Sequence, residues 1–176
     1  PFVKANCYHF STHVPLIFHY PNLFEPKIEN SLVSGVDLMP TILDIVGIES
    51  PYIDGTSYLK TILEDRPFKN FVYTCMGAPW HKTAYETRSI HNKEICYIIN
   101  FWADGKKRFF ADGQHKNSTS FVALTKSRAQ KLIYREREEL YDLREDLSCL
   151  NNLIDDPKYK TRLLEIKQQM IKLMKN

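Results

Sequence analysis

Residues 33–47, which read VSGVDLMPTILDIVG, constrain the fold more than any other stretch of the chain. Asp37 can cap a helix there, and Pro40 falls in the first turn, where a missing N–H costs nothing. Apolar side chains then recur at helical spacing until Gly47, which can adopt the left-handed conformation that ends a helix. They are Leu38, Ile42, Ile45 and Val46. We interpret the residues before Asp37 as the end of a buried strand. A strand that runs directly into a helix is a unit of an α/β sheet, so this stretch predicts an α/β fold.

Two further stretches belong to the same part of the chain. Residues 14–18 form a short apolar run followed by Pro21, as expected for a strand buried on both faces. Residues 59–63 repeat apolar side chains at helical spacing after turn signals at Pro51 and Gly55, which predicts a short second helix. We place a domain boundary after this helix. Residues 1–66 are then the C-terminal remnant of an α/β domain, and residues 67–176 are a smaller second domain.

The second domain has the pattern of an antiparallel sheet. Aromatic and β-branched residues are frequent in residues 71–73, 87–90 and 95–101, which predicts three strands. Residues 91–93 suit a hairpin turn between the last two of them. Residues 139–143, which read ELYDL, predict a final strand.

The chain ends in a predicted helix. Asp156 can cap it, and Pro157 fits its first turn. Its apolar stripe repeats every three or four residues, and we expect this stripe to pack across the small sheet. The stripe comprises Tyr159, Leu163, Ile166, Met170 and Leu173. The charged run at residues 135–139 is interpreted as a solvated face. The fold class is therefore α/β, with an α+β second half.

Composition excludes two classes of partner. Of the 176 residues, 43% are hydrophobic, which suffices for a core, and the net charge of +3 comes from well-mixed charged residues. Such mixing gives no single-sign field for nucleic acid, and no stretch approaches the roughly 20 apolar residues of a membrane span. We therefore expect neither nucleic acid nor a membrane as a partner. A polyanion such as a sulfated glycan is compatible with this charge.

The cysteines and one sequon bear on metal binding and compartment. The four cysteines form no CxxC pair, which argues against a structural zinc site and favours packing as small apolar groups. They are Cys7, Cys75, Cys96 and Cys149. Their even number leaves disulfides open in an oxidising compartment. Asn117 begins the triplet Asn-Ser-Thr, a glycosylation sequon that suits a secreted or lysosomal protein but also arises by chance.

The order of these motifs resembles the sulfatase family, which belongs to the alkaline-phosphatase superfamily. DLMPTILD at residues 37–44 and DGTSYL at residues 54–59 are similar to the late part of its large domain. Residues 85–101 are similar to a stretch of its small domain, and there the likeness is to the heparan sulfamidases. ELYDL is similar to the family's ending. The resemblance implies the end of a large α/β domain, followed by a small antiparallel sheet packed by a C-terminal helix.

The resemblance extends to the start of the chain. Lys4, Tyr8 and the VPL of residues 14–16 match the sulfatase pattern K-x-x-x-Y-E-x-G-x-R-V-P-L, with His9 and His13 in place of its Glu and Arg. In that family the lysine holds a sulfate oxygen. The resemblance therefore implies that Lys4 is a sulfate-binding cation of the active site. Without the family resemblance, Lys4 is interpreted as an exposed lysine near a chain end.

Two more residues are candidates for substrate binding. His81 lies in a predicted loop that can overhang a cleft, where a histidine can contact a sugar or pass a proton. The alternative is an ordinary loop histidine. Arg88 lies inside a strand pattern, where it either touches substrate or pairs with a carboxylate.

The resemblance also implies reactive groups that this sequence lacks. Sulfatases use a Cys or Ser in C/S-x-P/A-x-R, oxidised to formylglycine, and a calcium ion held by carboxylates. No such motif occurs in the chain, and the family's calcium-binding segments precede the position of Lys4. Removing the nucleophile of a covalent mechanism leaves little catalysis. We therefore interpret the chain as a fragment, without its N-terminal part or signal peptide, that holds no metal and is inactive alone.

Three hypotheses for function follow. In the first, the parent protein hydrolyses sulfate esters or N-sulfate groups of glycans such as heparan sulfate, so that its partner is a sulfated glycan. In the second, the superfamily fold acts on phosphoesters. In the third, the chain is a non-catalytic binding or dimerisation module derived from a sulfatase. A homodimer stays open in each case.

Overall fold

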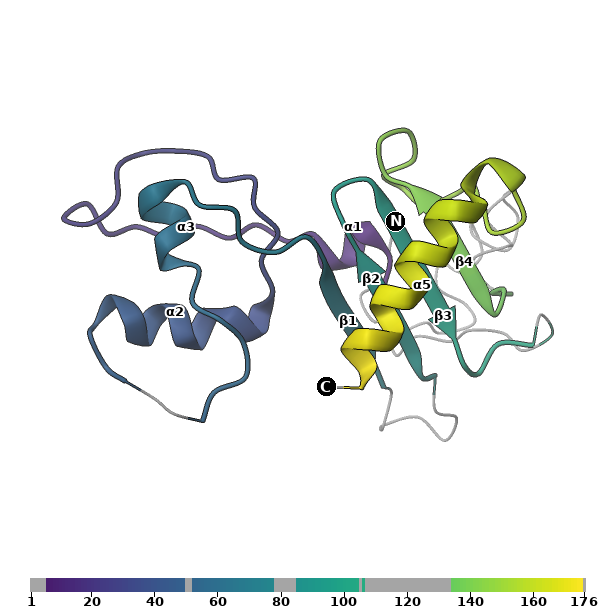
Figure 1. Ribbon diagram of the computed structural model, residues 1–176, viewed down its shortest axis with the longest axis horizontal. Coiled ribbons are helices and arrows are strands. Elements are labelled where there is room, and N and C mark those ends of the chain that lie inside the picture. The colour runs from purple at the N-terminus through teal and green to yellow at the C-terminus, as the bar shows by residue number, and fades with distance from the viewer. Residues whose placement is uncertain (1–5, 50–51, 78–84, 105, 107–133, 176) are drawn as a thin grey trace, which may run out of the picture. The chain divides into compact units, whose positions relative to one another are not determined.

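The computed structural model describes residues 6–49, 52–77, 85–104, 106 and 134–175 (Figure 1). Contacts divide the chain into two compact units. The sheet unit comprises Pro1–Val14 and Tyr73–Asn176, and the helical unit comprises Pro15–Val72. The division by contacts thus falls at residue 72 and groups the first 14 residues with the sheet. The domain boundary placed at residue 66 stays a prediction.

The sheet unit is built on four strands in the order β1-β2-β3-β4. The strands are β1 (Val72–Met76), β2 (Thr87–His91), β3 (Ile95–Asn100) and β4 (Glu138–Asp142). β2 pairs antiparallel with β3, and β3 pairs antiparallel with β4. Asn92 closes the hairpin between β2 and β3, because its side-chain oxygen accepts from the backbone N–H groups of Glu94 and Ile95. The predicted strands and hairpin turn are confirmed.

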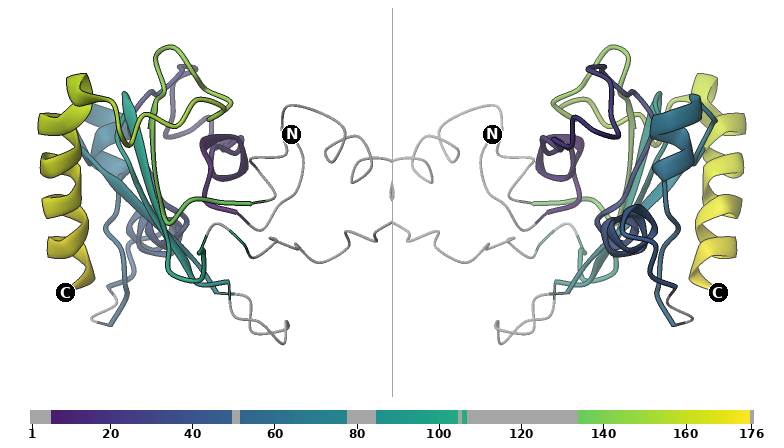
Figure 2. Two further views of the ribbon diagram at one scale, coloured as in Figure 1. Left: turned by 90° about the vertical axis from the view of Figure 1, so that its right-hand side faces the viewer. Right: turned by 90° about the vertical axis from the view of Figure 1, so that its left-hand side faces the viewer.

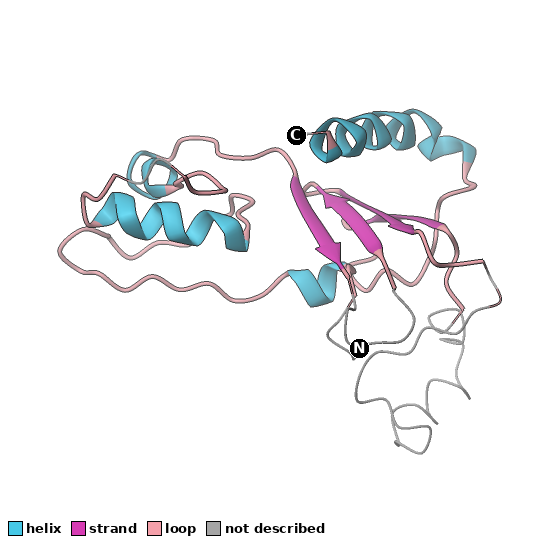
Figure 3. Ribbon diagram, turned by 90° about the horizontal axis from the view of Figure 1, so that it is seen from below, coloured by secondary structure: helices cyan, strands magenta, loops and turns pink. Residues whose placement is uncertain are grey.

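Two helices flank this sheet. α1 (His9–Thr12) and α5 (Lys160–Met174) lie on opposite faces of the strands (Figures 2 and 3). A 3-10 turn, η3 (Pro157–Tyr159), leads into α5, and the Asp156 side chain accepts from the backbone N–H of Lys158 as a cap. Ile166 and Met170 of α5 are each only 3% exposed. The predicted C-terminal helix and its packing on the sheet are confirmed.

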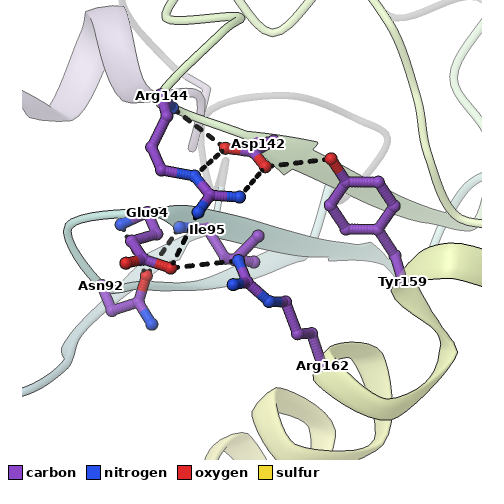
Figure 4. A network of polar contacts seen from close by, with 7 residues as sticks. All are labelled: Asn92, Glu94, Ile95, Asp142, Arg144, Tyr159 and Arg162. Atoms are coloured by element: carbon purple, nitrogen blue, oxygen red, sulfur yellow. Dashed lines mark hydrogen bonds and ion pairs between the residues drawn. The ribbon is translucent and has the colours of Figure 1, made fainter.

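Side-chain contacts tie α5 to the sheet through Asp142 at the end of β4 (Figure 4). One carboxylate oxygen of Asp142 accepts from the Tyr159 hydroxyl at 3.0 Å. The same carboxylate accepts from the guanidinium of Arg144, whose Nε and Nη2 lie 2.9 and 2.5 Å from its two oxygens. Arg162 of α5 pairs with Glu94 of the hairpin at 3.0 Å. The helix is thus attached by polar contacts at its start as well as by its apolar side chains.

The helical unit is organised around the buried Asp37. A 3-10 turn, η1 (Gly35–Asp37), precedes α2 (Leu38–Ile45), and α3 (Leu59–Glu64) contacts α2. The Asp37 carboxylate accepts from Lys69 Nζ at 2.6 and 2.8 Å and from the backbone N–H groups of Ser34 and Thr56. Asp37 therefore caps η1 and joins it to two distant segments, whereas its side chain makes no cap bond to α2.

Both predicted helices form in this unit, but the predicted strands do not. Residues 14–18 adopt no strand, and Ile17 is 87% exposed. Before Asp37 there is only an isolated bridge between Leu32 and Lys69. These two strand predictions are wrong, because a strand needs a hydrogen-bonding neighbour and the described part of this unit contains no sheet. The chain as a whole is nevertheless mixed α/β, with the small antiparallel sheet and closing helix that the sequence predicts.

Candidate functional site

The best-defined candidate site is the face of the sheet that lies opposite α5. Residues 6–13, here called the N-terminal segment, cover this face. Their Cys7 and Tyr8 side chains are 0% and 2% exposed and pack with Cys96, Ile98 and Tyr141 of the strands. In the sequence, this segment follows Lys4, the predicted sulfate-binding cation.

The strands present polar side chains to this segment. Alternation along β2 places Thr87, Ser89 and His91 on one face, and the register pairs them with Asn100, Ile98 and Cys96 of β3. All three side chains of β2 are buried. A half-buried antiparallel strand usually turns polar side chains to water, so a buried polar set requires partners within the protein.

Glu139 of β4 is the centre of this polar layer. It is 3% exposed and accepts three hydrogen bonds. Tyr8 donates to Oε2 at 2.7 Å, Tyr141 donates to the same oxygen, and Asn100 Nδ2 donates to Oε1 at 2.5 Å. The interpretation of residues 135–139 as a solvated face is therefore wrong for Glu139 and also for Arg135, which is 5% exposed. Glu139 is buried because its partners replace the hydrogen bonds of water.

Two further contacts fix the aromatic ring of Tyr8. The guanidinium carbon of Arg135 lies 4.6 Å from the ring centroid, within the range of a cation–π interaction. The Tyr141 ring meets Tyr8 edge-on at a centroid distance of 5.9 Å. Burial raises the pKa of the Tyr8 hydroxyl well above its usual value, and the neighbouring Glu139 carboxylate raises it further. Tyr8 therefore stays a neutral hydrogen-bond donor at physiological pH.

His91 holds the backbone of the N-terminal segment. Its Nε2 lies 2.9 Å from Ser89 Oγ and 3.2 Å from the carbonyl oxygen of Cys7. Burial lowers the pKa of His91 to about 4, and the ring of His9, 6.4 Å away, lowers it further in the same direction. His91 is therefore a neutral structural contact near pH 7, with no sign of a catalytic role.

Three of the four cysteines pack in the core as the sequence predicts, and Cys75 does not. Cys7, Cys96 and Cys149 are completely buried in the core on this face, Cys75 is exposed, and all four are free thiols. Burial raises the pKa of the Cys7 thiol to about 11, with weaker opposing effects from Ser89 and Arg135. Burial also raises the pKa of the Cys96 thiol well above its usual value, and a protonated, buried thiol is a poor nucleophile.

Of the predicted site residues, only Arg88 lies among the described residues. It belongs to β2, where alternation puts its side chain on the face away from Tyr8. Its Nη2 lies 2.5 Å from the Glu86 carboxylate, and Nη1 donates to the carbonyl of Thr87. Lys4, His81 and Asn117 lie outside the described residues. The roles of all four stay predictions.

Within the described part of the chain, no three His, Cys, Asp or Glu side chains come together in a way that could hold an ion. The buried carboxylates Glu139 and Asp142 are each occupied by donors from the protein. Among the same residues, no helix has the length and apolar character needed to cross a bilayer.

Sequence reasoning missed Glu139, Asn100 and Thr87. One sequence signal was available. In ELYDL, alternation along a strand puts Glu139 on the same face as Tyr141, and a large aromatic side chain favours a buried face. The donor from Tyr8 could not be foreseen, because it lies 131 residues away in the sequence.

Comparisons with known proteins identify the family of the chain. Residues 2–133 match the family described as "N-sulphoglucosamine sulphohydrolase, C-terminal". The chain is 26% identical over 186 aligned positions to an ulvan-active sulfatase of Formosa agariphila, covering 97% of this chain and 30% of that protein. It is 31% identical over 106 positions to arylsulfatase K of Bos taurus, covering 57% of this chain and 19% of that protein.

Among solved structures, the fold resembles BT4656, determined in complex with its substrate D-glucosamine-2-N,6-O-disulfate. The TM-score is 0.62 at 18% identity, and the match covers 89% of this chain and 27% of that one. The chain therefore spans about a third or less of each of these three proteins. The family match covers well over half of the present chain, and the chain thus belongs to the C-terminal family of the N-sulphoglucosamine sulphohydrolases, within the sulfatases.

Proposed function

We propose that this chain is the C-terminal part of a sulfatase that hydrolyses sulfate esters or N-sulfate groups of glycans such as heparan sulfate. The observation that carries the proposal is the family match over residues 2–133. The sulfated glucosamine bound by BT4656, whose fold is similar, supports a sulfated sugar as the substrate class. The protein's partner is then a sulfated glycan, and its compartment is the lysosome or the extracellular space.

In this proposal Lys4 binds the sulfate group. A sulfate is a compact anion, and one cation about 4 Å away contributes on the order of 4 kcal/mol at an effective dielectric near 20, before desolvation. A cation that also meets the charge released as the S–O or S–N bond breaks increases the rate. His81 and Arg88 contact the sugar in the same proposal, and Asn117 carries a glycan.

The reactive groups of the proposed enzyme lie outside this chain. Formylglycine, formed in a C/S-x-P/A-x-R motif that the sequence lacks, would supply the nucleophile. Calcium would be held by carboxylates of the parent protein that precede Lys4, as the resemblance to the sulfatases implies. The chain alone is therefore inactive in this proposal, and it contributes Lys4 and a stabilising sheet unit.

The test of Lys4 uses the full-length protein that carries this chain. We expect Lys4→Ala to lower kcat/KM for an N-sulfated glucosamine substrate about tenfold or more, because a charge partner of the sulfate is lost. Lys60→Ala is a matched control, since Lys60 is exposed on α3, and it should leave kcat/KM unchanged. Equal activity of Lys4→Ala and wild type would refute the assignment.

The reaction class needs a separate assay. The full-length protein should release inorganic sulfate from sulfated glucosamines and glycans. Release of phosphate from phosphomonoesters without sulfate release would select the phosphoesterase hypothesis. Binding of a sulfated glycan without turnover of either substrate would select the non-catalytic module.

A further inference from the structure

Helix α2 of the helical unit carries apolar side chains around most of its circumference. Residues 38–45 read LMPTILDI and contain a single charged residue, Asp44, whose carboxylate accepts from the Ser57 hydroxyl at 2.6 Å. A surface helix of a globular protein usually has one apolar stripe and a polar face opposite it, whereas a helix that is apolar all round is typical of a protein interior. The composition of α2 therefore predicts that protein covers it on more than one side.

The described residues cover α2 on one side. There the Thr41 hydroxyl accepts from the Tyr58 N–H at the start of α3, and α3 lies beside α2 (Figure 1). A different side carries Met39, Ile42 and Val46, which are 57%, 49% and 58% exposed. These three residues follow one another at intervals of three and four, so they share one face of the helix, here called the α2 surface.

The rest of the helical unit has little apolar core that the α2 surface can join. Among the described residues from 15 to 72, Tyr58 is the one hydrophobic side chain that is buried. The sheet unit, in contrast, has Ile90, Ile98 and Leu140 completely buried. Burial of apolar surface is the main driving force for folding, and a contiguous exposed apolar patch marks an interaction site where a single exposed side chain does not. The helical unit therefore needs a further apolar surface.

The relatives of this chain are much longer than the chain itself. It spans 30% of the ulvan-active sulfatase and 27% of BT4656, and the matching family model is described as C-terminal. In the proposed function, a larger part of the protein thus precedes this chain. A segment of the same polypeptide has a high effective concentration at the α2 surface, which favours it over a second copy of the chain as the covering partner.

We infer that the α2 surface packs against the part of the parent protein that precedes this chain, so that α2 is an internal helix of the larger domain. This inference rests on the proposed function, in which the chain is the C-terminal part of a longer sulfatase. The covering surface is apolar, because it replaces water around Met39, Ile42 and Val46.

Thiol labelling measures whether the α2 surface is covered. Met39→Cys is introduced into the 176-residue chain and into the full-length protein. Its reaction with a water-soluble maleimide is followed by mass spectrometry of the peptide that carries it. We expect labelling to be about tenfold slower or more in the full-length protein, because a covered thiol reacts only when the contact opens.

Leu164→Cys is the matched control. Leu164 is 55% exposed on α5, and Lys160 and Lys167 lie about one turn away on the same side of that helix. It is therefore an isolated apolar side chain on a charged face, and its cysteine should react at similar rates in both proteins.

Each other outcome of the labelling has a definite meaning. Equal labelling of Met39→Cys in the two proteins would overturn the inference. Slow labelling in the 176-residue chain that becomes faster on dilution would identify a second copy as the partner and would also overturn it. Release of sulfate by the full-length protein with equal labelling would refute the inference alone. Slow labelling of a full-length protein that releases no sulfate would support the inference and refute the proposed reaction.

Charge variants give a second measurement that needs no cysteine. The helix dipole favours an acidic residue near the start of α2 and a basic one near its end, so Met39→Glu and Val46→Lys should change the melting temperature of the 176-residue chain by about 2 °C or less. In the full-length protein each variant buries an unpaired charge, and we expect a decrease of about 5 °C or more.

Leu164→Glu is the control for these variants and should be tolerated in both proteins. Failure of Met39→Glu to fold in the full-length protein alone would support the same conclusion. Similar melting temperatures of wild type and both charge variants in the full-length protein would overturn the inference, as would equal losses in the full-length protein and the 176-residue chain.

Discussion

Gly55 shows how one residue decides a local fold. Its φ is +93°, and an added Cβ would lie 2.3 Å from the carbonyl oxygen of Val36 and 2.7 Å from the Val36 carbonyl carbon. Both obstacles are backbone atoms next to the buried Asp37, so they cannot move aside as a flexible side chain would. Glycine is therefore required for both its conformation and its lack of a side chain.

Gly55→Ala should lower the free energy of unfolding by about 2–3 kcal/mol, because both the left-handed backbone and the contact with Val36 become strained. Denaturant unfolding of the chain measures this. Gly35→Ala is the control, since a Cβ there meets nothing within 4 Å. Similar losses in the two variants would show that the close approach to Val36 is unimportant.

At the residue scale, the sequence predicted backbone conformations better than it predicted the hydrogen-bond partners of buried side chains. Gly47 and Gly55 both have positive φ, as their local sequences indicate, and Asp156 caps the turn η3 that leads into the final helix. In α2, however, the buried residue is Thr41, while Ile42 of the predicted apolar stripe is 49% exposed. Thr41 is buried because its hydroxyl donates to the Asp37 carbonyl and accepts from the Tyr58 N–H. Such partners cannot be read from helical spacing.

At the scale of elements, the attachment of α5 depends on the charge of Asp142 (Figure 4). Hydrogen bonds from Arg144, and a weaker one from Tyr159, hold the pKa of Asp142 well below its usual value. A depressed pKa means that the folded state favours the ionised form. The resulting stability is fully present above the unfolded pKa, about 3.9, and is lost as the pH falls below it.

Asp142→Asn should therefore destabilise the chain at pH 7 by about 1–2 kcal/mol, a modest value because Arg144 is 47% exposed and partly screened. The difference from wild type should shrink at pH 3, because Asp142 of the unfolded chain binds a proton below about pH 3.9 while folded Asp142 stays ionised. Urea unfolding at the two pH values checks this. Asp155→Asn, at an exposed position, should change stability at neither pH, and a constant deficit in Asp142→Asn would rule out the charge as the cause.

Element types were largely predictable, since periodicity depends on neighbours in sequence. The four strands of the sheet, α2, α3 and α5 were all indicated by their patterns. The error at residues 14–18 has a physical reason. An apolar run indicates that a segment favours burial. A strand also needs hydrogen bonds to a neighbouring backbone segment, and local composition does not predict whether such a neighbour is present.

At the scale of the whole molecule, the sheet unit and the helical unit have separate buried networks. Glu139 and Asp142 organise the first, and Asp37 organises the second. The sequence predicted a division into two parts. It did not predict that the first 14 residues group with the sheet, because that grouping depends on contacts with strands more than 60 residues away.

Separate networks predict separate local opening. Hydrogen exchange should become faster in residues 15–72 of Gly55→Ala, with little change in β3, whereas Asp142→Asn should speed exchange in α5 and leave α2 unchanged. Mass spectrometry of peptides from both units in each variant measures this. Faster exchange throughout the chain in either variant would mean that the two units open together.

The contact between Tyr8 and Glu139 has a consequence for truncated forms of the protein. The region that matches the family model ends at residue 133, before Glu139. A premature stop codon at that point would keep the whole region that the family model matches, with the lysine at position 4. It would delete β4, α5 and the carboxylate that receives the Tyr8 hydroxyl. The last 43 residues, from 134 to 176, therefore supply the acceptor that holds the Tyr8 side chain on the sheet.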